Sequence, residues 1–199
     1  MDSNDDDPWA AKKPKPRRAD ETALRKAALS YLQRYPSSKS NLRWVLQRRL
    51  HRAQQAYGAD AVAERSVIEK ILDECETAGL IDDRRYAGQA TQAWFNRGES
   101  VRAIKARLSQ KGVASTIIDE TLANLVHDNP NPDLAAAIAL TRRRHLGPYR
   151  HPDRRLDYLK KDLGVLARAG FSYPLARRVL EAENENALQD LLDEASPQR

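Results

Sequence analysis

Apolar side chains recur at helical spacing along nearly the whole chain from residue 20 onward. Positions three and four residues apart share one face of an α-helix, whereas a half-buried strand would alternate apolar and polar residues. No stretch sustains that alternation, so the pattern predicts an all-α protein. The first three predicted helices carry apolar faces at Leu24, Ala27, Ala28, Tyr31 and Leu32, at Leu42, Val45, Leu46, Leu50 and Ala53, and at Val67, Ile68, Ile71, Leu72 and Cys75.

The same pattern starts again twice. The next three predicted helices carry Tyr86, Ala90 and Trp94, then Val101, Ile104 and Leu108, then Ile117, Ile118, Leu122 and Leu125. The last three carry Leu134, Ile138 and Thr141, then Leu156, Leu159, Leu163 and Leu166, then Leu175, Val179 and Leu180.

Three glycines set the register of this repeat. Gly58, Gly112 and Gly170, spaced 54 and 58 residues apart, are predicted C-cap positions. Each is soon followed by a residue that can cap the next helix, namely Asp60, Ser115 and Ser172. A three-helix unit of this size buries little apolar surface alone, so we expect three units to stack into an elongated array.

Proline and charge mark the ends of the chain. Residues 1–19 contain three prolines and few apolar side chains that could repay the entropy of ordering. We therefore predict a disordered tail at 1–19, three-helix units at 20–79, 80–128 and 129–183, and an acidic C-terminal extension at 184–199.

The composition excludes a membrane protein. Of the 199 residues, 31% are charged, and the mean hydropathy is −0.74. The longest apolar run, residues 134–140, is far shorter than the roughly 20 residues of a spanning helix. The acidic residues 1–7 do not resemble a secretory signal, and a lone Cys75 fits a reducing compartment. We expect a cytoplasmic protein.

The net charge of +6 conceals blocks of alternating sign. Residues 22–59 hold eight basic residues and no acid, and residues 84–112 and 141–161 each carry +6, with acidic stretches between them. These blocks are solvated faces neutralised by neighbouring acidic helices, or they bind a partner. Three blocks in register favour binding, because stacked units would align them into a stripe that suits a long polyanion such as DNA. The candidate DNA- or partner-binding residues are Arg43, Arg48, Arg49, Arg52, Arg84, Arg85, Arg97, Arg102, Lys105, Arg107, Lys111, Arg142, Arg143, Arg144, Arg154 and Arg155.

Motifs of known catalytic or metal sites are missing from the sequence. It contains neither a glycine-rich phosphate loop nor a nucleophile elbow nor a zinc-binding pattern. Cys75 continues the apolar stripe of its helix, which favours a buried structural role. We therefore expect no enzyme activity, no cofactor and no metal.

Residues 100–125 also fit a helix-turn-helix, with Gly112 in the turn. A transcriptional regulator that reads DNA would present polar side chains at the start of its second helix. Ser115, Thr116 and Asp119 occupy that place and form a weak set of base readers.

Two groups of residues resemble the RecX family, whose members regulate the bacterial recombinase RecA. The resemblance is strongest over residues 24–126. Its core is the run from Gly79 to Ala87, followed by Arg97, Gly98, Ile104, Leu108, Lys111, Gly112 and Val113. Upstream it rests on Ala28, Leu29, Tyr31, Leu32, Arg34, Ser40, Leu42 and Leu46. Two departures are Asn41, where the family commonly has an acidic residue, and a longer stretch from His51 to Ala63.

The resemblance implies an all-helical array that docks in the groove of the RecA filament on single-stranded DNA. Such binding would depress ATP hydrolysis, strand exchange and co-protease activity, with a consequence for DNA repair and the SOS response. The implied partners are the RecA nucleoprotein filament and single-stranded DNA, with weaker binding to duplex DNA. Two alternatives stay open: a transcriptional regulator that uses residues 100–125, and a scaffold that binds protein only.

Overall fold

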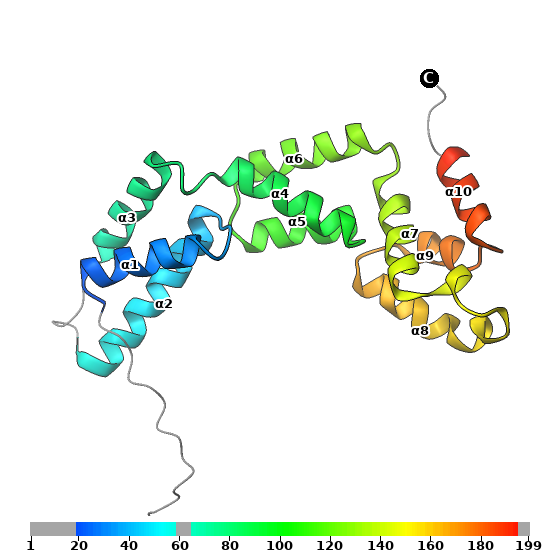
Figure 1. Cartoon of the computed structure of the whole chain (residues 1–199), viewed down its shortest axis with the longest axis horizontal. Helices are drawn as coiled ribbons and strands as arrows, with labels where there is room; N and C mark the ends of the chain where they lie inside the picture. Colours follow the sequence, from blue (N-terminus) through cyan, green and yellow to red (C-terminus); the bar gives the residue numbers. More distant parts are fainter. Residues whose placement is uncertain (1–18, 59–64, 195–199) are drawn as a thin grey trace, which may run out of the picture.

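The computed structural model describes residues 19–58 and 65–194, and within these residues it contains ten α-helices and no β-strand. The helices follow one another along an elongated molecule (Figure 1). The prediction of an all-α array is therefore confirmed. The first group of helices is α1 (Glu21–Leu32), α2 (Lys39–Tyr57) and α3 (Arg65–Thr77), and the second is α4 (Asp83–Asn96), α5 (Val101–Gln110) and α6 (Ser115–Asp128). The third group is α7 (Pro132–Arg144), the 3-10 turns η2 (Gly147–Tyr149) and η3 (Pro152–Arg154), α8 (Arg155–Arg168), α9 (Tyr173–Leu180) and α10 (Glu185–Glu194).

Short polar side chains fix the starts of several helices. Asp20 Oδ1 accepts a hydrogen bond of 2.8 Å from the Ala23 amide, and Asp82 Oδ1 accepts one of 2.9 Å from the Arg85 amide. Such bonds satisfy amides that have no partner within their own helix.

The three helix-capping residues predicted after the glycines have three different outcomes. The prediction for Ser115 is wrong, because α6 already begins at Ser115 and Ala114 takes the N-cap position. Ser172 does occupy the N-cap of α9, but its side chain makes no capping hydrogen bond. Asp60 lies outside the described residues, as do residues 1–18 of the predicted tail.

The described residues bury their apolar side chains in two clusters. One belongs to α1, α2 and α3 and closes with Ile81. The other runs without a break from Ala87 in α4 to Leu188 in α10, so the second and third groups share one core. The sequence pattern predicted three units but could not show that two of them are fused through their cores.

Two features of the third group differ from the sequence prediction. Leu156, expected on the apolar face of its helix, is 85% exposed at the second position of α8. Residues 185–194 of the predicted acidic extension form α10, whose Leu188 is only 1% exposed and packs in the second core. These residues are therefore a part of the packed fold.

The same kind of contact joins the first group to the second and the second to the third. The start of α2 meets the second group, where the Lys39 amide donates to Asp83 Oδ1 at 2.8 Å and the Ser38 hydroxyl donates to the Lys111 carbonyl. The start of α5 meets the third group in the same way. There the Val101 amide donates to Asp133 Oδ1 at 2.8 Å, and the Ser100 amide donates to the Ala169 carbonyl at 3.2 Å.

Glycine permits the close approach at both junctions. Gly112 (φ 69°) follows α5 and lies against Ser40, and Gly170 (φ 96°) follows α8 and lies against Ser100. A Cβ atom at either glycine would overlap the serine side chain. Positive φ angles are also strained for residues that carry a Cβ atom.

Candidate nucleic-acid interface

The outer face of α2 carries a row of one aromatic and two basic side chains. Trp44, Arg48 and Arg52 are spaced by four residues and therefore lie along the same side of the helix. The Arg48 guanidinium lies 4.5 Å from the centre of the Trp44 ring, in cation–π contact. Trp44 is nevertheless 54% exposed.

Two hollows flank this row, and Trp44 lines both. One, of about 740 Å³, lies between α1 and α2, and the other, of about 400 Å³, reaches toward the first residue of α3. No acidic residue is among the described residues that line either hollow. We call this region the Trp44 surface; its basic residues are Lys26, Arg34, Arg48, Arg49, Arg52 and Arg65.

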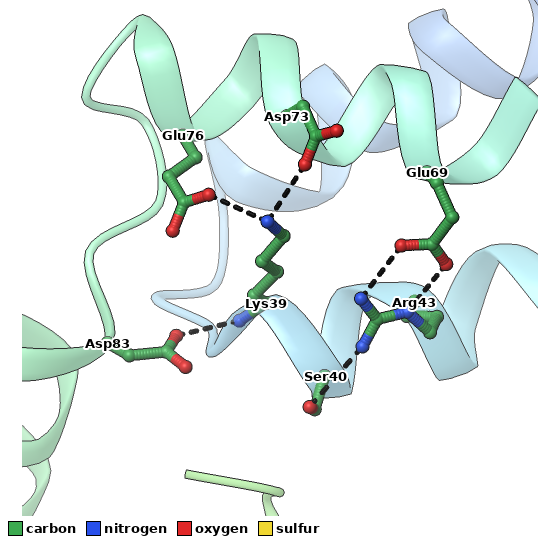
Figure 2. A network of polar contacts seen from close by, with 7 residues as sticks. All are labelled: Lys39, Ser40, Arg43, Glu69, Asp73, Glu76 and Asp83. Atoms are coloured by element: carbon green, nitrogen blue, oxygen red, sulfur yellow. Dashed lines mark hydrogen bonds and ion pairs between the residues drawn. The ribbon is translucent and has the colours of Figure 1, made fainter. Parts of the chain in front are cut away.

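The side of α2 that faces α3 is neutralised instead (Figure 2). Arg43 pairs with Glu69 through two hydrogen bonds of 2.7 and 2.8 Å, an arrangement that raises the pKa of the guanidinium and lowers that of the carboxyl. Lys39 Nζ lies 2.7 Å from Glu76 Oε2 and 2.9 Å from Asp73 Oδ1, and these hydrogen bonds raise the pKa of the ammonium. Arg43, a predicted binding residue, therefore has an acidic partner within the fold.

A third basic hollow, of about 470 Å³, lies where the second and third groups meet. Its lining includes one acid, Glu99, which forms an ion pair with Arg107. Arg107 also stands 4.9 Å from the centre of the Trp94 ring. We call this region the junction hollow; its basic residues are Arg97, Arg107, Arg143, Arg144 and Arg168.

The other candidates of the second group are mostly engaged within the fold. Arg84 pairs with Glu120, and Lys105 Nζ lies 2.9 Å from Asp119 Oδ1. Arg85 donates a hydrogen bond of 2.8 Å to the Gly79 carbonyl, and Lys111 Nζ donates one of 3.2 Å to Asn41 Oδ1.

In the third group, Arg155 has a structural role. Its guanidinium donates to the carbonyl oxygens of Arg150, Pro148 and Glu183, which ties together η2, the start of α8 and the approach to α10. Arg142 donates to the Tyr149 hydroxyl at 3.3 Å. Within the described residues, the candidates whose side chains form neither a hydrogen bond nor an ion pair are Arg48, Arg52, Arg97, Arg102, Arg143, Arg144 and Arg154.

Sequence reasoning missed one buried ion pair. Arg150 Nη2 lies 3.0 Å from Asp162 Oδ1, and the Asp162 side chain is 5% exposed. The Gly147 amide donates to the same carboxylate at 3.2 Å, and Arg150 lies over the Tyr158 ring at 4.3 Å. The sequence did contain a signal for this pair, because Asp162 lies on the same helix face as the apolar Leu159 and Leu166.

The described residues contain no group of three or more His, Cys, Asp or Glu side chains that could hold a metal ion. None of their helices is long and apolar enough to cross a membrane. Burial raises the pKa of the Cys75 thiol, which makes it a poorer nucleophile.

The comparisons with known proteins all indicate the same family. Residues 82–122 match the family model described as RecX, second three-helix domain. A regulatory protein RecX from Myxococcus xanthus is 34% identical over 169 residues, which cover 84% of this chain and 89% of that protein. Another from Agrobacterium fabrum is 27% identical over 179 residues, covering 80% and 93%.

A solved structure shows the same fold. The crystal structure of RecX from Lactobacillus salivarius superimposes with a TM-score of 0.52 and 19% identity, over 88% of this chain and 97% of that one. At 19% sequence identity, this similarity establishes the architecture alone. The Myxococcus protein is similar enough, over nearly its whole length, to establish the relationship. The chain therefore belongs to the RecX family of regulatory proteins.

Proposed function

We propose that this protein modulates the recombinase RecA, mainly as an inhibitor, by binding along the RecA filament on single-stranded DNA. Family membership supports the partner. The observation that carries the binding mode is the pair of basic regions, the Trp44 surface and the junction hollow, at separate positions of an elongated array. Both concentrate arginine, and among the described residues that line them Glu99 is the one acid, which favours contact with phosphate.

The proposed mechanism is occupation of the filament, without chemistry on a substrate. An elongated helical array can contact several protomers at once, and its cations can lie against the DNA within. Such contacts would hinder the motions that ATP hydrolysis and strand exchange require, and would cover surface needed for co-protease activity. On this proposal the protein is not an enzyme, needs no cofactor and acts in the cytoplasm beside RecA.

The structure does not favour the alternative of a sequence-reading helix-turn-helix in α5 and α6. The exposed side of α6 carries Asp119 and Glu120, whose carboxylates would meet the phosphates of a duplex. Both are engaged with cations of the neighbouring helices, Lys105 and Arg84.

The decisive experiment is a titration of the DNA-dependent ATPase of RecA on poly(dT). We expect inhibition at substoichiometric protein, because one elongated molecule would span several protomers. Absence of inhibition up to an equimolar ratio would refute the proposal.

A charge-reversal pair tests whether the basic surface takes part. The double variant Arg48→Glu, Arg52→Glu should weaken inhibition strongly while helical content is retained, because both side chains are exposed and unpaired within the described residues. The matched control Lys160→Glu, Lys161→Glu changes the net charge equally on exposed positions of the third group, and Lys161 lies over the Tyr158 ring as Arg48 lies over Trp44. We expect the control to inhibit like the wild type.

A further inference from the structure

Trp44 is an aromatic side chain that the fold does not use for its own packing. It is 54% exposed and belongs to neither apolar core, whereas Trp94 is half-buried against the second core. Exposing an indole ring to water is unfavourable, so an exposed Trp amid arginines is typical of a surface that binds another molecule. Tyr35, 55% exposed, lines the same hollow between α1 and α2.

The neighbours of Trp44 hold the ring in place and supply charge. Arg48 lies 4.5 Å from the ring centre on one side, which restrains the indole without burying it. Arg52 stands one helical turn further along, about 6 Å in the direction of the axis. The row therefore offers one stacking surface and two adjacent cations to a chain that runs along α2.

The part of α2 that carries Arg52 has no equivalent in the second group. The helix has 19 residues, whereas α1 beside it has 12 and the corresponding second helix of the next group, α5, has 10. The last turns of α2 therefore have no counterpart in α5, and they carry Arg52.

We propose that Trp44 stacks on an unpaired nucleobase of single-stranded DNA while Arg48 and Arg52 contact the flanking phosphates. Only a single strand presents a free base face, because the bases of a duplex are stacked on one another and covered. Aromatic stacking combined with a basic track is the way many proteins hold single strands without reading sequence. The inference rests on the proposed function for the origin of the strand, the DNA within the RecA filament.

The test measures binding of fluorescein-labelled dT oligonucleotides to the full chain without RecA, by anisotropy. Trp44→Ala should weaken binding about 5- to 150-fold, the range that loss of one stacked base produces. Trp44→Phe should recover much of the loss. Tyr173→Ala, which removes an aromatic side chain of similar exposure (61%) from α9, should bind like the wild type.

An abasic oligonucleotide of equal length separates stacking from charge. It keeps the phosphates, so Arg52→Ala should still weaken its binding, while Trp44→Ala should have no effect on it. Arg52→Ala should also reduce the slope of log affinity against log salt by about 0.7, whereas Trp44→Ala should leave the slope unchanged.

Two results would overturn the inference. One is wild-type affinity of Trp44→Ala for the dT oligonucleotide. The other is an equal loss on the dT and abasic strands, which would make Trp44 a support for the cations only. Because RecA is absent from these measurements, either result leaves the ATPase titration to decide the proposed function separately.

Discussion

The contact between Gly112 and Ser40 provides a direct test of how the first and second groups are held together. We consider Gly112→Ala, with Gly79→Ala as its control. The two glycines have nearly the same backbone angle, φ 69° and 67°. A Cβ atom at Gly79 would meet nothing within 4 Å, whereas at Gly112 it would overlap Ser40, with Oγ at 2.9 Å.

The expected loss in the free energy of unfolding has two parts. A left-handed backbone angle costs an alanine about 1–2 kcal/mol, and this cost applies to both variants. The overlap with Ser40 adds about 1–3 kcal/mol at Gly112 alone, the usual cost of forcing extra atoms into a packed site. Ser40 lies in the first turn of α2, so its Cβ is fixed by the helix and cannot turn away.

The assay is urea unfolding followed by far-UV circular dichroism. Gly112→Ala should lose about 1–3 kcal/mol more than Gly79→Ala. Because the contact joins helices of two separate cores, its loss should also broaden the transition or split it into two. Adding Ser40→Gly should restore part of the loss in Gly112→Ala, and a double-mutant cycle measures this coupling. Equal losses at Gly112 and Gly79, or strict additivity with Ser40→Gly, would refute the reasoning.

Three further substitutions test other parts of the fold by urea unfolding. The Arg43 hydrogen bond lowers the pKa of Glu69, so this carboxylate contributes stability above about pH 4.3 and loses it as the pH falls through the folded-state pKa. Glu69→Gln should therefore be less stable than the wild type at pH 7, and this difference should disappear once the pH is below the folded-state pKa of Glu69; a difference that stays constant with pH would contradict this. Asp162→Asn should cost about 3 kcal/mol, because it leaves the Arg150 guanidinium without its carboxylate, and a loss below about 1 kcal/mol would show that water replaces the pair. Leu188→Ala should cost about 2–5 kcal/mol if α10 is part of the core, and a negligible loss would show that α10 is only an appendage.

Apolar spacing was sufficient to predict nine of the helices because their buried faces are regular. Leu24 and Ala28 in α1, and Ile104 and Leu108 in α5, repeat at four-residue intervals and are fully buried. The tenth helix escaped prediction because its buried Leu188 lies in an acidic stretch, where charge indicated an extension. The sharing of one core by the second and third groups depends on contacts between residues far apart in sequence, which periodicity does not contain.

The candidate binding residues were predicted less well, for a related reason. Block charges show where cations occur but not which of them have an acidic partner. Arg43 meets Glu69 across 26 positions, and Arg84 meets Glu120 across 36, so neither pair follows from local spacing. Such exposed pairs contribute little stability, yet they remove a cation from the set available to a polyanion.

The phase of each helix nevertheless carries part of this information. Along α2, Leu46 marks the buried side, and at about 100° per residue Arg48 lies about 160° away from it while Arg43 lies about 60° away. Arg43 therefore flanks the apolar stripe, where it meets Glu69 of α3, and Arg48 points away from the packed helices.

The same relation holds in α5. Lys105 follows the buried Ile104 by one residue, about 100° around the helix, and it pairs with Asp119. Arg102 precedes Ile104 by two residues, about 160° from the buried side, and forms no ion pair within the described residues. A cation beside the apolar stripe meets the neighbouring helix, and a cation opposite the stripe stays available. By this criterion Arg102 belongs with Arg48 and Arg52 among the cations that can reach a bound strand. Lys105 and Arg43 instead pair with carboxylates of neighbouring helices.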